Sequence, residues 1–143
     1  MKELQESVLI AELRAKGISP SPQRLAVYGY LKSHPVHSTA DVLMRELKPS
    51  LPTLSLTTIY NTLKLFVSKN LVNEVIIEDG ELRFDADLRD HAHFKCVTCQ
   101  EVFDLFPEGE KIEISNLPSL PEGFSVESVH LCFRGRCARC TAQ

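Results

Sequence analysis

Four of the five cysteines form two Cys-x-x-Cys pairs, Cys96 with Cys99 and Cys137 with Cys140. Both sulfurs of such a short turn can point to one centre, so two pairs can supply the four thiolates of a tetrahedral Zn²⁺ site. Two disulfides or a thioredoxin-like redox pair are the alternatives, although a reducing compartment disfavours disulfides. We therefore predict a structural zinc site, with a strand and a helix between the two pairs. The remaining Cys132 lies in an apolar run and is predicted to be a small buried side chain.

Two histidines, His91 and His93, stand immediately before the first cysteine pair. On a strand, residues i and i+2 point to the same face, so both imidazoles can reach one ion. Imidazole and carboxylate ligands together suit Fe²⁺, Mn²⁺ or Zn²⁺. Four acids lie close enough in the sequence to complete such a site: Asp85, Asp87, Asp90 and Asp104. The same spacing is also compatible with two surface histidines.

Two further histidines, His34 and His37, flank Pro35 in the first half of the chain. Either could be a loop residue without a role. If one of them is a metal ligand, it ties the first half of the chain to the second.

Charge is divided unevenly along the 143 residues, whose formal net charge is −3. Residues 1–72 hold nine Lys/Arg and five Asp/Glu, whereas residues 73–143 hold seven and fourteen. This asymmetry indicates two modules, a basic one that could face phosphate and an acidic one that could hold cations. The composition, 43% hydrophobic and 24% charged, excludes a mostly disordered chain.

Membrane and export signals are not expected. No apolar run approaches the roughly 18–20 residues that span a bilayer. The first six residues carry acids and no continuous apolar core, so they do not resemble a signal peptide. We therefore expect a cytoplasmic protein.

The first half is predicted to fold as helices. The first helix ends at Gly17, and the second begins at the cap Ser21 and stops before Pro35. Ser38 or Thr39 can cap a third helix, and Ser55 can cap a fourth. The fourth helix places its apolar side chains at helical spacing and thereby forms a buried face: Ile59, Leu63, Phe66 and Val67.

A β-hairpin is predicted to follow these helices. Residues 71–77 have strand character, Asp79-Gly80 is a turn signal, and residues 81–85 form the returning strand. Helices followed by a hairpin are the outline of a winged helix-turn-helix. The alternative is an ordinary small α+β domain.

The exposed face of the fourth helix carries hydrogen-bonding and cationic side chains: Thr57, Tyr60, Asn61 and Lys64. Such a face favours contact with DNA bases and phosphates. Arg14 and Lys16, near the end of the first helix, are expected to contact phosphate or the edges of a groove.

The second half has short strand-like runs at 93–97, 102–106 and 124–133, with one possible helix near 108–116. We predict an α+β protein with three parts. Residues 1–84 form a winged-helix DNA-binding domain, residues 85–90 a hinge, and residues 91–143 a small α/β dimerisation and metal-binding domain with the zinc site.

Several motifs in one order resemble the ferric uptake regulator (Fur) family. Ser21-Pro22-Gln23-Arg24 resembles the opening of that family's second helix, and residues 56–63, which include Thr58, resemble its recognition helix. His91-Ala92-His93-Phe94-Lys95-Cys96 matches His-x-His-x-x-Cys, and both cysteine pairs fall in place. The resemblance implies a homodimeric, metal-dependent repressor of double-stranded operator DNA rather than an enzyme.

The resemblance also implies ligand sets. It implies that the four paired cysteines bind a structural zinc ion: Cys96, Cys99, Cys137 and Cys140. A regulatory Fe²⁺ or Mn²⁺ falls on His37, Asp85, His91, His93 and Asp104. An additional metal site of some members is not implied, because Ala92 stands where they have an acid and His130 is displaced by one position.

Two positions resemble the peroxide-sensing (PerR) branch, Asp104 where iron sensors usually have Glu and Asn61 where they usually have Arg. In that branch the residues corresponding to His37 and His91 are oxidised to 2-oxo-histidine, the metal leaves and the repressor releases DNA. The alternative within the family is a regulator that senses iron or zinc availability by reversible binding.

Overall fold

The computed structural model describes residues 2–34, 37–78, 81–89, 91–108, 118–126 and 129–142. It divides into two compact units, Met1–Leu88 and Arg89–Gln143. We call them unit 1 and unit 2 and describe each by itself. None of the described helices is long and apolar enough to cross a membrane.

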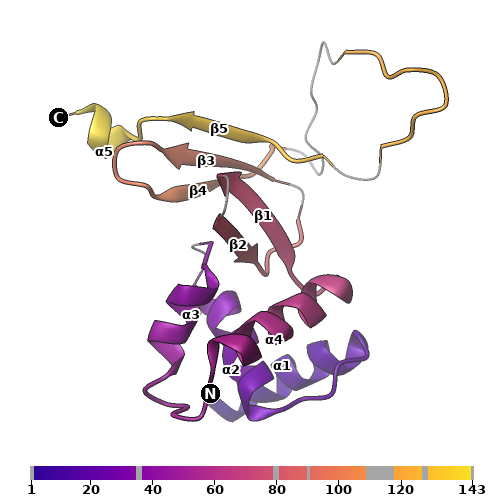
Figure 1. Ribbon diagram of the computed structural model, residues 1–143, viewed down its shortest axis with the longest axis vertical. Coiled ribbons are helices and arrows are strands. Elements are labelled where there is room, and N and C mark those ends of the chain that lie inside the picture. Colours follow the sequence, from indigo (N-terminus) through magenta and orange to yellow (C-terminus); the bar gives the residue numbers. More distant parts are fainter. Residues whose placement is uncertain are drawn as a thin grey trace. The chain divides into compact units, whose positions relative to one another are not determined.

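Unit 1 contains four helices followed by a two-stranded antiparallel sheet (Figure 1). The elements are α1 (Lys2–Ala15), α2 (Pro22–Ser33), α3 (Ala40–Leu47), α4 (Leu56–Ser68), β1 (Asn73–Glu78) and β2 (Glu81–Asp85). The order confirms the winged-helix outline. The expected turn at residues 79–80 lies outside the described residues.

Side-chain caps define where three of these helices begin. Ser21 accepts a hydrogen bond from the Arg24 amide, and Ser55 accepts one from Thr58, each through its hydroxyl. At α3 the choice between two candidate caps falls on Thr39, whose hydroxyl accepts from the Val42 amide. Each cap satisfies an amide that has no partner within its helix. Gly17, with φ of 73°, ends the turn after α1 because a residue with a side chain rarely adopts that backbone conformation.

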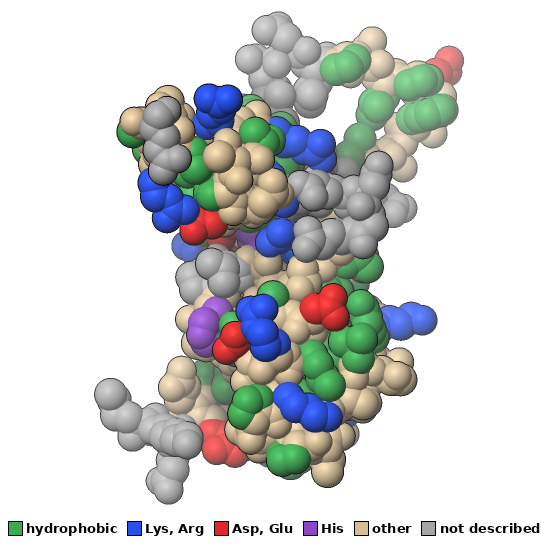
Figure 2. All heavy atoms as spheres, turned by 60° about the vertical axis from the view of Figure 1, so that its left-hand side comes forward, with side chains coloured by type: hydrophobic (Ala, Val, Ile, Leu, Met, Phe, Trp, Pro, Cys, Tyr) green, Lys and Arg blue, Asp and Glu red, His purple; other side chains and the backbone are tan. Residues whose placement is uncertain are grey.

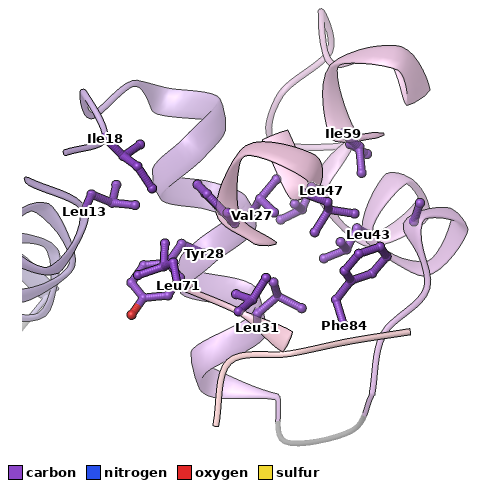
Figure 3. Packing of buried hydrophobic residues seen from close by; sticks show 14 of the residues in the cluster. Leu13, Ile18, Val27, Tyr28, Leu31, Leu43, Leu47, Ile59, Leu71 and Phe84 are labelled. Carbon is purple, nitrogen blue, oxygen red and sulfur yellow. The ribbon is translucent and has the colours of Figure 1, made fainter. Parts of the chain in front are cut away.

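A single apolar core holds unit 1 together (Figure 3). Each helix contributes fully buried side chains, among them Leu13, Val27, Leu43 and Ile59. Phe84 brings β2 into the same cluster. The predicted buried face of α4 is confirmed for Ile59, Leu63 and Phe66, whereas Val67 is only partly buried.

The wing is attached to the helices through an isolated β-bridge between Ser38 and Phe84. The Phe84 amide donates to the Ser38 carbonyl at 3.0 Å. Because this bridge fixes Ser38 beside β2, it also fixes the neighbouring His37 beside the end of that strand.

The described residues of unit 2 form a three-stranded sheet in the order β4-β3-β5 and a short helix that follows it. The elements are β3 (Ala92–Cys96), β4 (Val102–Leu105), β5 (Cys132–Gly135) and α5 (Ala138–Thr141). β3 pairs with β4 antiparallel and with β5 parallel. The first two strands confirm the predicted runs at 93–97 and 102–106 within one residue.

The third predicted strand, at 124–133, is wrong in its extent. Among the described residues it begins only at Cys132 and continues to Gly135. Pro121 and Gly123, which has φ of 84°, form a turn in which the Phe124 amide donates to the Pro121 carbonyl, so the chain leaves extended pairing there. Of the helix predicted near 108–116, all but residue 108 lies outside the described residues.

Candidate metal centres

The four paired cysteines lie where two neighbouring parallel strands of unit 2, β3 and β5, end. Cys96 ends β3, and Cys99 lies in the turn that follows it. Cys137 precedes the first turn of α5, and Cys140 lies within that helix. Parallel pairing of β3 with β5 places Cys96 opposite Gly135, and the Val97 amide donates to the Gly135 carbonyl at 2.8 Å. The two cysteine-bearing turns therefore lie at the same end of the sheet.

The sulfur geometry fits a tetrahedral ion. All four ligand atoms lie within 4.8 Å of one another, and the Cys99 and Cys137 sulfurs are 3.8 Å apart. Zn–S bonds of about 2.3 Å in a tetrahedron separate sulfurs by about 3.8 Å. A disulfide would hold two sulfurs at about 2.05 Å. Four thiolates at zinc spacing are therefore the arrangement that the described residues support.

Backbone amides stabilise negative charge on the cysteine sulfurs. The Cys137 amide donates to the Cys96 sulfur at 3.4 Å. Backbone hydrogen bonds from Cys99 and Cys137 lower the pKa of Cys96 to about 6. Burial, followed by the neighbouring sulfurs, raises the pKa of Cys140 to about 12. Because four thiolates repel one another in a buried site, a divalent cation is the natural counter-charge.

One ion pair beside the cysteines was not foreseen from the sequence. The Arg139 guanidinium lies 3.2 Å from the Glu101 carboxylate and also beside the Cys99 sulfur. Glu101 follows one cysteine pair and Arg139 lies inside the other, so only the fold reveals their proximity.

In unit 1, His37 and Asp85 form a buried pair. The His37 Nδ1 lies 3.4 Å from the Asp85 Oδ2, and both side chains are almost fully buried. Arg83 donates to the His37 carbonyl at 3.2 Å, while the Asp87 amide donates to Asp85 Oδ1 at 2.9 Å. The β-bridge, Arg83 and the Asp87 amide together fix both groups. Asp87 supplies a backbone amide here, and Asp90 lies outside the described residues.

The other histidine of the first half has a different environment. His34 is exposed, and its ring stacks on Tyr30 with centroids 3.9 Å apart. Its Nδ1 lies 3.0 Å from both the Tyr30 carbonyl and the Ser33 hydroxyl.

In unit 2, His91 and His93 converge on Asp104. The Asp104 Oδ1 lies 3.3 Å from His91 Nε2 and 3.7 Å from His93 Nε2. The β3–β4 register places His93 directly opposite Asp104. The His91 Nδ1 lies 2.5 Å from the Arg89 carbonyl, and this contact orients the ring with Nε2 toward Asp104. Two imidazole nitrogens and a carboxylate oxygen therefore meet at one place on the sheet.

Cys132 corrects a prediction. Its side chain is exposed in the described chain, not buried. β5 is an outer strand of the β4-β3-β5 sheet, so it has a neighbouring strand on one side only among the described residues. His130, just before this strand, is exposed as well.

The predicted DNA-contacting side chains lie on exposed surfaces of unit 1. Thr57, Tyr60, Asn61 and Lys64 are exposed on α4, and Arg14 and Lys16 are exposed at the end of α1. Thr58 is half-buried, and its hydroxyl lies 2.9 Å from that of Ser55. On the face drawn in Figure 2, Lys and Arg side chains are interspersed with apolar and polar ones instead of forming one continuous patch.

Comparison with known proteins gives consistent matches. A sequence profile described as "Ferric uptake regulator family" matches residues 15–134. The peroxide-responsive repressor PerR of Staphylococcus aureus strain Mu50 is 37% identical over 138 residues, which are 96% of this chain and 91% of that protein. PerR from strain USA300 is 36% identical over the same coverage.

Solved structures agree on the fold. The ferric uptake regulator Fur of Helicobacter pylori superposes with a TM-score of 0.68 at 16% identity, covering 99% of this chain and 94% of that one. PerR from Streptococcus pyogenes superposes with a TM-score of 0.52 at 24% identity, covering 94% and 92% of the two chains.

Proposed function

Because the chain belongs to the ferric uptake regulator family of metal-responsive regulators, we propose that it is a homodimeric repressor that senses hydrogen peroxide and then releases operator DNA. The observation that carries this proposal is the convergence of His91 and His93 on Asp104, together with the buried pair of His37 and Asp85. The identity to peroxide-responsive repressors along most of the chain supports it.

Two ions have distinct roles in this proposal. Structural Zn²⁺ is held by Cys96, Cys99, Cys137 and Cys140. Regulatory Fe²⁺ or Mn²⁺ is held by His37, Asp85, His91, His93 and Asp104, a nitrogen and oxygen donor set that suits those ions. Because these five ligands belong partly to unit 1 and partly to unit 2, metal binding favours the arrangement of the units that binds DNA.

The peroxide response is proposed to change the ligands themselves. Bound Fe²⁺ supplies the redox chemistry that activates peroxide next to the ring carbons of His37 and His91. Each modified imidazole gains one oxygen atom from H₂O₂, and the second oxygen atom leaves as water. The altered ring binds a metal poorly, so the two units lose their shared ion and the protein releases DNA. Mn²⁺ supports DNA binding without this oxidation.

DNA is proposed to bind to unit 1 of each protomer. In a dimer, two copies of α4 can enter successive major grooves of a near-palindromic site. The side chains that contact bases and phosphates are proposed to be Thr57, Thr58, Tyr60, Asn61 and Lys64. Arg14 and Lys16, exposed at the end of α1, contact phosphate.

The test compares Fe²⁺-loaded and Mn²⁺-loaded protein before and after addition of peroxide. Mass spectrometry follows the gain of one oxygen atom on the His37 and His91 peptides, and DNA release is measured on the same samples. We expect oxidation and release to occur together with Fe²⁺, and neither with Mn²⁺. Asp104→Glu retains a carboxylate but changes its reach, so both oxidation and release should slow together.

Two results would contradict this proposal in different ways. Release with oxidised cysteines and intact histidines would indicate a thiol-based sensor. Metal-dependent DNA binding that peroxide leaves unchanged would indicate a regulator of iron or zinc availability.

A further inference from the structure

Tyr28 of α2 connects two other helices of unit 1. Its side chain is 4% exposed, and its hydroxyl donates to Oε2 of Glu12 on α1 at 2.5 Å. Its ring meets that of Phe66 on α4 edge-on, with centroids 5.9 Å apart. Figure 3 shows the Tyr28 ring inside the core cluster with its oxygen at the margin. One side chain therefore contacts both α1 and α4.

Lys32 completes the arrangement around Glu12. Its Nζ lies 3.4 Å from Glu12 Oε1 and 5.8 Å from the centre of the Tyr28 ring. Both carboxylate oxygens of Glu12 are thus engaged by α2. The Lys32 ion pair is partly exposed and contributes little by itself. The bond from the buried phenol to a carboxylate is charge-assisted and directional, so it is the stronger constraint.

Apolar contacts set how closely α1 approaches α2. Leu9 of α1 approaches Gly29 of α2 so closely that a side-chain carbon at Gly29 would lie 3.2 Å from the Leu9 methyl group. Leu13 is completely buried one residue after Glu12. These contacts set the distance between the helices, whereas a hydrogen bond also sets direction. Glu12 therefore adds a directional constraint to the last turn of α1.

We propose that Tyr28 is a positioning residue for DNA binding, which fixes the end of α1 relative to α4 through Glu12. Arg14 and Lys16, exposed on the turn that follows Glu12, then contact phosphate while α4 contacts bases. This inference rests on the proposed function. It assigns no DNA contact to Tyr28 itself, which acts through the two cations.

The experiment measures DNA binding by the full-length, Mn²⁺-loaded protein across a range of salt concentrations. The probe is a duplex that the wild-type protein selects from random-sequence DNA. Tyr28→Phe removes only the hydroxyl and keeps the contact with Phe66. We expect the slope of log affinity against log salt to fall in magnitude by about one to two for each protomer bound, roughly one for each lost phosphate contact. Relative preference among duplex sequences should stay unchanged.

Two further comparisons separate positioning from a loss of stability. In a background that carries Arg14→Gln and Lys16→Gln, Tyr28→Phe should have no additional effect on the slope. Glu12→Gln keeps an oxygen acceptor for the Tyr28 hydroxyl and should retain most of the wild-type slope. Glu12→Ala removes the acceptor and should reduce the slope as Tyr28→Phe does. It therefore tests the inference even if Tyr28→Phe does not fold. Tyr30→Phe is the matched control, since the Tyr30 ring stacks on His34.

Two results would overturn the inference and leave the proposed function intact. One is an unchanged slope in folded Tyr28→Phe. The other is that Tyr28→Phe lowers the slope as much in the background that lacks Arg14 and Lys16 as it does in the wild-type protein. Absence of metal-activated DNA binding in the wild-type protein would overturn both. Urea unfolding of each variant verifies that all the proteins compared are folded under the assay conditions.

Discussion

The Tyr28 hydroxyl makes the stability of unit 1 depend on pH in the alkaline range. Burial, and then the bond to Glu12, raise the pKa of Tyr28 well above its usual range. In the unfolded chain the phenol of Tyr28 ionises near pH 10, whereas in the folded protein it stays protonated at that pH. The stabilisation is therefore complete below about pH 10 and is lost as pH rises from there toward the folded pKa. Urea unfolding between neutral and alkaline pH should show this loss, and Tyr28→Phe should show less of it.

Cys96 and Cys132 lie on neighbouring strands and provide a matched pair of substitutions. Cys96→Ser removes a sulfur from the four-cysteine cluster and should abolish zinc binding and cooperative unfolding of unit 2. In small zinc-binding peptides, structural zinc contributes about 10–16 kcal/mol to the free energy of folding. A small unit that loses this contribution should not stay folded. Cys132→Ser, at an exposed position, should retain zinc and change stability by no more than about 0.5 kcal/mol.

Metal analysis and thermal unfolding of the two variants check this prediction. A Cys96→Ser protein that lacks zinc but unfolds at the wild-type temperature would show that the metal has no structural role.

Residue types and spacing were sufficient to identify the cysteine site but not the whole His/Asp set. Each Cys-x-x-Cys pair already holds two sulfurs close together within one short turn, so the fold only has to bring two turns together. The choice between Asp85 and Asp87 depends on the Ser38–Phe84 bridge, which aligns His37 with the end of β2. That bridge joins segments far apart in the sequence, so no local pattern encodes it.

At the scale of elements, the DNA contacts proposed for α4 are of two kinds. Asn61→Ala should remove a base contact, cost about 1–3 kcal/mol on the preferred sequence and relax preference at one base pair. Lys64→Gln should remove a phosphate contact, weaken all sequences alike and reduce the salt slope by about one for each protomer bound. Both side chains are exposed, so neither substitution should alter the core.

Binding of the two variants to a panel of single-base-pair variants of the duplex distinguishes these effects. If Asn61→Ala changed neither affinity nor preference, α4 would not be the element that contacts bases.

Elements with local start signals were predicted well, and elements that depend on distant partners were not. The caps at Ser21, Thr39 and Ser55 act within one helical turn, so the sequence determines them locally. Among the described residues, β5 begins at Cys132 because its pairing with β3 starts there. Alternating apolar residues before it resembled a strand, but a strand also needs a partner at the right register.

For the molecule as a whole, His37 tests whether metal couples the two units. His37→Ala removes a proposed regulatory ligand of unit 1 and leaves the four cysteines untouched. Zinc content and dimerisation should stay at wild-type levels, while Mn²⁺ should no longer increase DNA affinity. His34→Ala is the control, since this exposed imidazole stacks on Tyr30.

Zinc analysis, sedimentation and DNA titration with and without Mn²⁺ measure the three properties on one sample. Mn²⁺-activated binding by His37→Ala equal to that of the wild-type protein would mean that the ion does not act through this residue.

The parallel pairing of β3 with β5 has a consequence for the order in which a newly made chain folds. All elements of unit 1 are synthesised before β3, so that unit can form its core while translation continues. Unit 2 is different, because its central strand waits for a neighbour that the ribosome adds after the long intervening segment. During that interval Cys96 and Cys99 have emerged without Cys137 and Cys140. A Zn²⁺ ion that needs all four thiolates can therefore bind only after Cys137 and Cys140 have emerged, when the elements of unit 1 have long left the ribosome.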